Sequence, residues 1–362
     1  MLSSLKQVVK AAARQCVFTG HTAGLLRSNW HSRERVSILA YHSVCPLDDP
    51  FRPYIGPNIS IEPEVFERQI AYLVRHYRIV DLSTLARYLS DGYDDERPLL
   101  ALTFDDGYRD NYRYAFPILR RYHAPATFFL TTDCIDGGPP LWALEAAYCL
   151  LNSPRTTLSV QSVNQRFDLR TWDERRASLR LLKRPLSGLP RADRARVIEE
   201  LRRESGIASD AFFADTMLRW HEVTEMRDAG MEFGSHTRSH PSLPYIPKQE
   251  AQDEIVGSKL ALERALGEPM RHFCYPNPSG RPNFNDELSA LLRASGFMTS
   301  VTSQSGYVTM GESLFSMHRI GIYRAHGPLP AFYFRLNDRA LDRPAPGGMS
   351  VGPGARQPEA NQ

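Results

Sequence analysis

The chain of 362 residues is long enough for two or three domains, although a single α/β barrel also reaches this length. Its 42% hydrophobic and 23% charged residues are ordinary for a soluble globular protein. The formal net charge of +3 is too small to indicate a nucleic-acid-binding protein, so we expect no nucleic-acid partner.

The cysteines and the hydropathy of the chain indicate a cytoplasmic protein. Five cysteines are present, an odd number without C-x-x-C spacing, which predicts reduced and mostly buried thiols rather than a disulfide framework. No run of 18 apolar residues occurs, so we expect no transmembrane helix. The first residues also lack the uninterrupted apolar stretch of a cleaved signal peptide.

Residues 1–36 form a basic segment in which apolar residues recur at helical spacing. The apolar positions are Leu2, Leu5, Val9, Ala12 and Cys16, and the basic residues between them are Lys6, Lys10 and Arg14. Such an amphipathic helix could lie on a membrane surface or pack against its own domain, and both interpretations are open. Membrane contact through residues 2–30 would place the protein at the inner face of a membrane.

From residue 37 onward, short apolar runs alternate with amphipathic helical patterns. The runs predicted to be strands are Ser37–Tyr41, Leu99–Phe104, Ala126–Thr131, Met231–Gly234, His272–Tyr275, Phe297–Val301 and Arg319–Ile322. The clearest helical patterns are Phe66, Ile70, Leu73 and Tyr77, and further on Ile255, Leu262 and Leu266. This alternation predicts an α/β fold, most simply a barrel of about seven parallel strands with helices outside.

Two segments interrupt the alternation. Residues 145–220 hold arginine-rich helical patterns and few strand-like runs, which predicts a helical insertion in a barrel loop over or beside the site. Its charges are typical of a solvated face, with the binding of an anionic substrate as the alternative. Residues 341–362 are rich in Pro and Gly and predict a disordered tail, so the catalytic domain would span residues 37–340.

Polar residues follow four of the predicted strands at the point where each strand ends. They are His42, then Asp105 and Asp106, then Ser235–His240, and finally Tyr275, Pro276 and Asn277. The carboxyl ends of parallel barrel strands open on one face, which is where active sites of such barrels lie. We therefore expect these segments to converge on one site.

His236 and His240 have the i, i+4 spacing that lets two imidazoles reach one metal ion. Two neutral imidazoles and one carboxylate suit a divalent ion with an open position, which we expect to be zinc, with cobalt, nickel or manganese also compatible. If Asp106 supplies that carboxylate, Asp105 can stay ionised beside it as a general base, because adjacent residues at a strand exit point in different directions.

These motifs resemble those of the polysaccharide deacetylase family (NodB homology, carbohydrate esterase family 4). The resemblance rests on "TFDDGYRDNY", "ATFFL", "SHTRSHPSL" and "YPN", within about residues 37–323. It implies a distorted (β/α) barrel and a divalent metal that serves to remove acetyl groups from N-acetylated sugars. It also implies that Asp105 is the base and that Asp106, His236 and His240 are the metal ligands.

Two histidines are candidates for the acid that protonates the leaving amine. His42 ends an apolar strand and should emerge at the barrel mouth, whereas His318 begins the last strand and should lie at the opposite face. This comparison favours His42.

Five further residues are assigned supporting roles, and three of them, Tyr275, Pro276 and Asn277, are expected to contact the substrate or the oxyanion. Arg319 or Arg271 is expected to orient the base by a charge-assisted hydrogen bond. The oxyanion is expected to sit on the metal and on the backbone N–H of Tyr275.

The predicted enzyme is a metal-dependent hydrolase of carbon–nitrogen bonds other than peptide bonds. It would remove N-acetyl groups from an acetamido sugar in a polysaccharide, an oligosaccharide or a lipid-linked glycan, and this glycan is the expected partner. The alternatives are an O-acetyl esterase, a hydrolase of a non-sugar amide, an Fe(II) oxygenase and a non-catalytic carbohydrate-binding protein. An oxygenase would not need the spare Asp105, and a binding protein would not need an intact ligand set and base.

Overall fold

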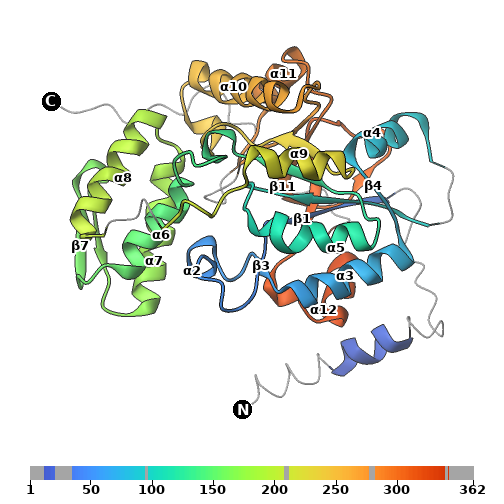
Figure 1. Ribbon diagram of the computed structural model, residues 1–362, viewed down its shortest axis with the longest axis horizontal. Coiled ribbons are helices and arrows are strands. Elements are labelled where there is room, and N and C mark those ends of the chain that lie inside the picture. The colour runs from blue at the N-terminus through green and yellow to red at the C-terminus, as the bar shows by residue number, and fades with distance from the viewer. Residues whose placement is uncertain are drawn as a thin grey trace.

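The computed structural model describes residues 12–20, 35–93, 97–207, 212–276, 282–338 and Leu341. Its centre is a closed barrel of seven parallel strands surrounded by helices, which confirms the predicted fold class (Figure 1). The strands are β1 (Arg35–Tyr41), β5 (Leu99–Phe104), β6 (Thr127–Leu130), β9 (Glu232–Ser235), β10 (His272–Cys274), β11 (Thr299–Ser305) and β13 (Met317–Gly321). The barrel closes because β1 pairs in parallel with both β5 and β13.

The remaining strands are short. β4 (Arg78–Val80) extends the sheet beside β5, and β12 (Val308–Thr309) runs antiparallel to β1. β2 (Ser43–Val44) pairs with β3 (Ser60–Ile61) just after the first barrel strand. Each of the seven predicted strands coincides with a barrel strand, although β11 starts two residues later than expected and runs on to Ser305. Its second half is polar, so no apolar run marked it in the sequence.

Helices enclose the barrel. They are α2 (Arg52–Ile55), α3 (Pro63–His76), α4 (Leu82–Asp91), α5 (Phe116–Arg121), α9 (Trp220–Asp228), α10 (Lys248–Leu266), α11 (Asp286–Ala294) and α12 (Leu329–Leu336). The two predicted apolar faces are buried, with Phe66, Ile70 and Leu73 on α3 and Ile255 and Leu262 on α10 all fully inaccessible. Burial of such side chains, each worth about 1.5–3 kcal/mol, holds the helices on the sheet.

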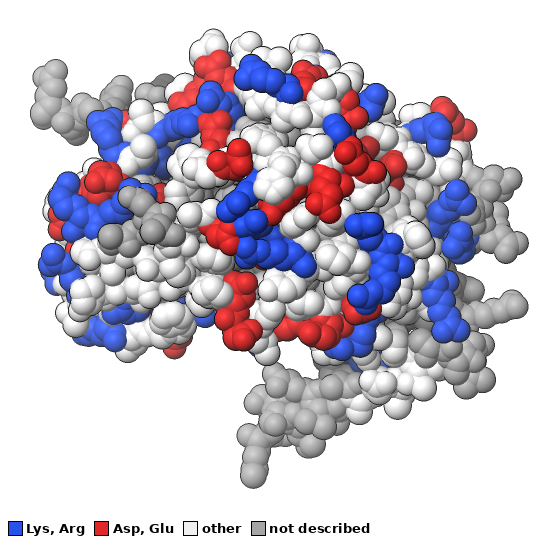
Figure 2. Space-filling view, viewed as in Figure 1, with Lys and Arg blue, Asp and Glu red and all other residues white. Residues whose placement is uncertain are grey.

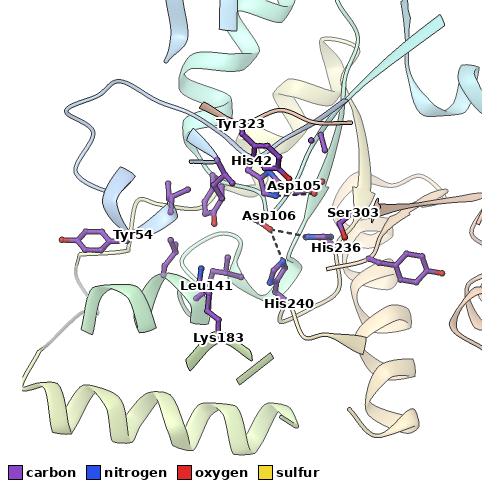
Figure 3. Close-up of a pocket in the computed structure, with 18 of the residues that line it drawn as sticks. His42, Tyr54, Asp105, Asp106, Leu141, Lys183, His236, His240, Ser303 and Tyr323 are labelled. Carbon is purple, nitrogen blue, oxygen red and sulfur yellow. Dashed lines mark ion pairs between the residues drawn. The ribbon is translucent and has the colours of Figure 1, made fainter. Parts of the chain in front are cut away.

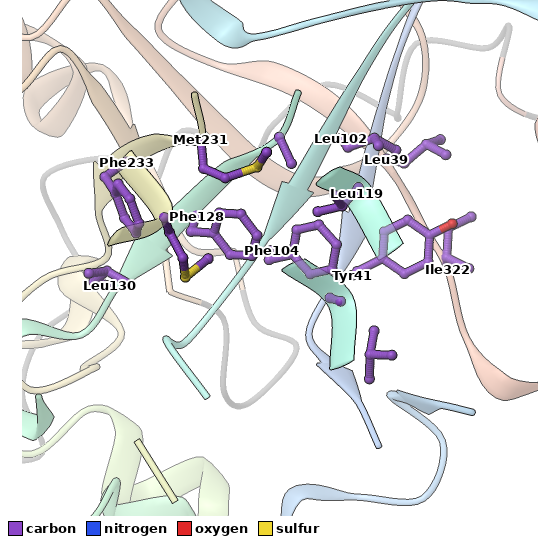
Figure 4. Packing of buried hydrophobic residues seen from close by; sticks show 14 of the residues in the cluster. Leu39, Tyr41, Leu102, Phe104, Leu119, Phe128, Leu130, Met231, Phe233 and Ile322 are labelled. Atoms are coloured by element: carbon purple, nitrogen blue, oxygen red, sulfur yellow. The ribbon is translucent and has the colours of Figure 1, made fainter. Parts of the chain in front are cut away.

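Side chains along each barrel strand alternate between two hydrophobic cores. On β5, Leu100, Leu102 and Phe104 pack under the outer helices, whereas Leu99 and Ala101 join a cluster that fills the barrel interior. The outer core contains a row of aromatic rings across four neighbouring strands, seen in Figure 4. Its members are Tyr41, Phe104, Phe128 and Phe233, with successive ring centroids 5.4, 4.7 and 5.9 Å apart. This period of two determines which residues beyond a strand end point inward.

A helical insertion lies between β6 and β9 and forms its own lobe beside the barrel (Figure 1). It comprises α6 (Trp142–Asn152), a hairpin of β7 (Thr157–Val160) and β8 (Gln165–Asp168), α7 (Trp172–Ser187) and α8 (Arg191–Ser205). The lobe has a separate hydrophobic core that includes Leu150, Phe167, Leu182 and Leu201. Polar residues alternate through the hairpin, so no apolar run marks its strands in the sequence.

The charges of the insertion are partly solvated and partly structural. On the face drawn in Figure 2, basic and acidic side chains are interspersed. Arg194, however, is buried against the Trp142 ring, and Arg202 forms an ion pair with the buried Glu145. The prediction of a solvated face is therefore incomplete, because some arginines hold α8 against α6.

Part of the predicted amphipathic N-terminal helix lies within the described residues. Residues 12–20 are helical, and the Phe18 ring contacts Tyr72 of α3 and Tyr333 of α12, with centroids 6.1 and 5.9 Å apart. This portion packs on the barrel domain; residues 2–11 and the tail from residue 342 lie outside the described residues. No described helix combines the length and apolar character needed to cross a membrane. All five cysteines are free thiols, and four of them are buried.

Candidate metal centre and active site

The alternation of side chains along three barrel strands, β1, β5 and β13, brings polar residues of the site together. On β1, Val36 and Ile38 face the interior, and His42 continues that series. On β5, Leu99 and Ala101 are followed inward by Asp105. Arg319 of β13 shares the parity of Met317, which lies in the interior core. His42, Asp105 and Arg319 line a cavity of about 370 Å³ at the carboxyl ends of the strands (Figure 3).

Asp106, His236 and His240 form a compact cluster in this cavity. Asp106 Oδ1 lies 3.4 Å from His236 Nε2 and 3.1 Å from His240 Nε2, as the dashed lines in Figure 3 show. One ligand atom from each residue lies within 4.8 Å of the other two, and all three residues are buried. Two imidazole nitrogens and one carboxylate at this separation can hold a divalent ion.

The chain is bent sharply at these residues. Asp106 has φ of 75°, Thr237 of 67° and His240 of 60°, all in the left-handed region that ordinary residues rarely adopt. Hydrogen bonds hold the second bend: His240 N–H donates to Thr237 Oγ1 at 3.0 Å, and the Thr237 carbonyl accepts from the Thr132 N–H at 3.1 Å. Backbone strain of this kind is concentrated at functional sites, where surrounding contacts impose it.

Hydrogen bonds with neighbouring residues orient His236 and support the loop that carries His240. His236 Nδ1 donates to the Cys274 carbonyl at 2.8 Å, so Nε2 is the ring nitrogen that faces Asp106 and would bind an ion. The His240 carbonyl accepts from the Trp142 indole at 3.0 Å, so the insertion supports the His240 loop. A second cluster, Asp105, His236 and Cys274, has similar spacing. Burial raises the pKa of the Cys274 thiol, which disfavours the thiolate that a metal requires.

The electrostatics of the cluster suit a cation. Burial by itself would raise the pKa of Asp106, but hydrogen bonds from His236 and His240 hold it well below its usual range. Burial also lowers the pKa of His240, which favours the neutral imidazole that binds metals. In His236 that effect is outweighed by Cys274 and Asp106, which raise its pKa, so a metal would displace a proton there.

Asp105 is held by Arg319. Arg319 donates from Nη1 to Asp105 Oδ1 and from Nη2 to Oδ2, both at 2.7 Å, and both side chains are buried. Arg319 is itself positioned by hydrogen bonds to the Thr103 hydroxyl at 3.0 Å and to the Thr302 carbonyl at 2.8 Å. Burial would raise the pKa of Asp105, but the charge and hydrogen bonds of Arg319 outweigh it and lower the pKa to about 2. Asp105 is therefore a carboxylate at neutral pH.

His42 is the histidine beside this carboxylate. Its Nε2 lies 3.8 Å from Asp105 Oδ2, and its side chain is 25% exposed at the cavity wall. Its Nδ1 is buried without a hydrogen-bond partner among the described residues. His318 lies elsewhere: it is out of phase with Arg319 on β13, does not line the cavity and is within 3.2 Å of Gln304 Oε1.

Two of the supporting assignments are wrong. Arg271 precedes β10 at the amino end of the barrel with an exposed side chain, so it cannot orient Asp105. The Tyr275 N–H donates to the Val301 carbonyl at 3.1 Å, and it is therefore not free to receive an oxyanion. Tyr275 does line the cavity, although its ring packs against the outer core on the same side of the strand as Phe273. Pro276 is buried and has no N–H, and Asn277 lies outside the described residues.

The sequence reasoning missed several residues of the cavity. Tyr323 follows β13, Tyr108 follows the Asp105–Gly107 turn, and Lys183 enters from α7 of the insertion (Figure 3). Tyr108 and Tyr323 stand close to motifs that were recognised and could have been found from that proximity. Lys183 stands among many basic residues of a helical pattern, and no local signal distinguishes it.

Comparison with known proteins defines the class of this chain. The sequence pattern of the polysaccharide deacetylase family matches residues 92–183 and 186–299, more than half of the chain. The chain therefore belongs to the polysaccharide deacetylase family. The predicted family and the predicted enzyme class, a deacetylase among the hydrolases, are confirmed.

Individual relatives are distant. The Bacillus subtilis protein YxkH is 19% identical over 299 residues, which cover 82% of this chain and 75% of that protein. The poly-β-1,6-N-acetyl-D-glucosamine N-deacetylase of Staphylococcus epidermidis is 34% identical over 113 residues, 28% of this chain and 38% of that enzyme.

Solved structures share the fold. The Streptococcus pyogenes deacetylase PplD, in complex with acetate, has a TM-score of 0.55 and 20% identity, with 83% of this chain and 97% of that chain covered. IcaB from Ammonifex degensii has a TM-score of 0.53 and 18% identity over the same shares.

Proposed function

We propose that this protein is a metal-dependent N-deacetylase that hydrolyses the acetamido group of a sugar unit in a glycan. The observation that carries the proposal is the pairing of two adjacent aspartates with different partners. Asp106 joins two imidazoles in a cluster with the spacing of a metal site, whereas Asp105 is ionised, held by Arg319 and free of that cluster.

The three-residue cluster fits one divalent ion, which we propose to be zinc. When bound there, such an ion supplies Lewis acidity toward the acetyl oxygen and lowers the pKa of a water molecule toward neutrality. The remaining chemistry belongs to side chains of this chain. Oδ1 of Asp105 accepts from Arg319 and from the Cys274 thiol, whereas Oδ2 accepts one bond from Arg319 and retains a lone pair that can take the proton of the attacking water.

We propose His42 as the residue that protonates the leaving group. An amine cannot depart as an anion, so the C–N bond breaks only as a proton reaches the nitrogen. His42 lies on the same inward series as Asp105, with Nε2 3.8 Å from the carboxylate. In its protonated form it would donate to the nitrogen, which releases acetate and a free amino sugar.

Cleavage of an amide is favoured over that of an O-acetyl ester by the relative from S. epidermidis, which is named as an N-deacetylase of an N-acetylglucosamine polymer. An Fe(II) oxygenase is disfavoured because two histidines and one carboxylate complete its metal site, so the ion pair of Asp105 and Arg319 would have no role in the reaction.

The test is acetate release by zinc-reconstituted protein from chitooligomers, peptidoglycan fragments and acetylated xylan. We expect release from the N-acetylated substrates, loss of activity after chelation and recovery when zinc is added back. Release from acetylated xylan alone would contradict the proposed amide specificity. Absence of acetate from every substrate by the metal-loaded protein would refute the proposed function.

A further inference from the structure

A lysine from the insertion enters the cavity that holds the metal cluster. Lys183 lies on α7 and lines the cavity together with Leu141, Asp106 and His240. Figure 3 shows its side chain reaching from the helix toward this group of residues. Its neighbours on α7, Leu182 and Leu186, are fully buried in the core of the insertion, and they fix the face of the helix that Lys183 occupies.

The position of α7 relative to the site is also fixed. Ser187, at the end of α7, accepts at its carbonyl a hydrogen bond from the Ser242 N–H at 2.7 Å. Ser242 follows His240 by two residues, and the Trp142 indole of α6 holds the His240 carbonyl at 3.0 Å. The insertion is thus attached to the loop that carries the histidine ligands, so Lys183 is placed by the same framework as the cluster.

Lys183 has no ion pair or hydrogen bond to any residue that the structure describes. The two carboxylates of the cavity are engaged elsewhere: Asp105 by both terminal nitrogens of Arg319, and Asp106 by the two imidazoles. Burial lowers the pKa of the Lys183 ammonium, and the Asp106 carboxylate only partly opposes that effect. A half-buried ammonium beside the apolar wall of Leu141, Ala143 and Leu144 is stabilised by an anion that arrives with the substrate.

The charges of the cavity favour such an anion. Asp105 and Arg319 neutralise each other, and a divalent ion would more than neutralise Asp106. With Asp106 offset by that ion, Lys183 adds a positive charge that no ion pair with a described residue neutralises. The hydroxyl groups of a neutral sugar can accept a hydrogen bond from lysine, but they cannot offset this charge.

We propose that Lys183 binds an acidic group of the substrate, so that the preferred substrate is an acetamido sugar bearing a phosphate or a carboxylate close to the reacting unit. This inference rests on the proposed deacetylase function and adds the substrate class. A sugar phosphate and a uronic acid offer the same chemistry to an ammonium group. Lys183 lines the same cavity as His240, so the acidic group must lie on the reacting sugar or on its immediate neighbour.

The experiment compares three substrates of the zinc-loaded protein at low ionic strength. They are a neutral N-acetylglucosamine oligomer, N-acetylglucosamine 1-phosphate and an oligosaccharide that alternates N-acetylglucosamine with glucuronic acid. We expect kcat/KM to be at least about tenfold higher for one of the acidic substrates, the ratio that corresponds to one charge-assisted hydrogen bond. Preference for the phosphate or for the uronic acid identifies the source of the acidic group.

Variants then assign the preference to Lys183. Lys183→Met keeps the length of the side chain without its charge, and we expect it to abolish the ratio mainly through a higher KM for the acidic substrate. Arg184→Met removes one charge from the adjacent, exposed position on α7 and should retain the ratio. Equal kcat/KM for acidic and neutral substrates in the wild-type protein, or a ratio unchanged by Lys183→Met, would overturn the inference.

Binding measurements separate this inference from the proposed function. Calorimetric titration of the same three sugars into wild-type and Lys183→Met protein requires no turnover. Tighter binding of an acidic sugar that is lost in Lys183→Met, without acetate release from any substrate, would support the inference and refute the deacetylase proposal. Acetate release from all three sugars at similar rates, with equal affinities, would support the deacetylase and refute the inference.

Discussion

Replacement of Arg319 by methionine should change both the stability of the protein and the pH dependence of that stability. Arg319 and Asp105 are both buried and share two 2.7 Å hydrogen bonds. Removal of the guanidinium leaves a buried carboxylate without its partner, which costs about 3–5 kcal/mol. We therefore expect Arg319→Met to lower the free energy of unfolding of the metal-free protein at pH 7 by that amount.

The pKa of Asp105 determines the pH range of the effect. In the wild-type protein this pKa is lowered from 3.8 to about 2, which corresponds to about 2 kcal/mol of stability. That contribution is complete above the unfolded pKa and is lost as the pH falls from 3.8 toward 2. In Arg319→Met, burial acts without the guanidinium and raises the pKa of Asp105. Protonation of Asp105 as the pH falls should therefore remove part of the destabilisation caused by the buried charge. The difference between the two proteins should therefore shrink in acid.

Urea unfolding of both proteins at pH 7 and at pH 4 measures this change. The matched control is Arg121→Met, which breaks the exposed ion pair with Glu67 and should cost less than about 1 kcal/mol at either pH. Equal stability of Arg319→Met and the wild type, or a stability difference that grows in acid, would refute the account of the Asp105–Arg319 pair.

The remaining predictions concern the roles of single residues in the site. Asp105→Asn should abolish acetate release and leave metal content near one ion per chain; loss of metal would instead make Asp105 a ligand. His42→Ala should retain the metal and lower kcat by roughly a hundredfold. His318→Ala should cost far less, and the reverse order would exclude His42 as the acid. His240→Ala should reduce bound zinc, measured by elemental analysis, and restoration of full zinc content at equimolar metal would contradict its assignment as a ligand.

The apolar strands and the polar residues that end them explain why much of the fold and part of the site could be predicted from the sequence. An apolar run such as Leu99–Phe104 is buried on both faces, and its end is marked by the first charged residue, Asp105. The carboxyl ends of parallel strands lie at one face of a barrel, so a residue that ends such a run is assigned to the mouth without knowledge of any contact. His42 and His236 are located by the same local signal.

The tertiary structure alone distinguishes residues that look equivalent in the sequence. Arg271 and Arg319 both adjoin predicted strands, yet only Arg319 lies at the depth and parity that reach Asp105, 214 positions away along the chain. The Tyr275 N–H already donates to the Val301 carbonyl of the neighbouring strand β11. The register that pairs these two residues cannot be predicted from the sequence of either strand by itself.

The position of Lys183 in the site also could not be predicted from the sequence of the insertion. Its helix is recognisable from local spacing, but its place beside His240 depends on hydrogen bonds between α7, α6 and the His236–His240 loop. Apolar periodicity is a local property of the chain and therefore determines the strands, the helices and the ends at which chemistry occurs. The pairing of charges in the site depends on closure of the barrel and on docking of the insertion, which bring together residues whose separation along the chain carries no signal.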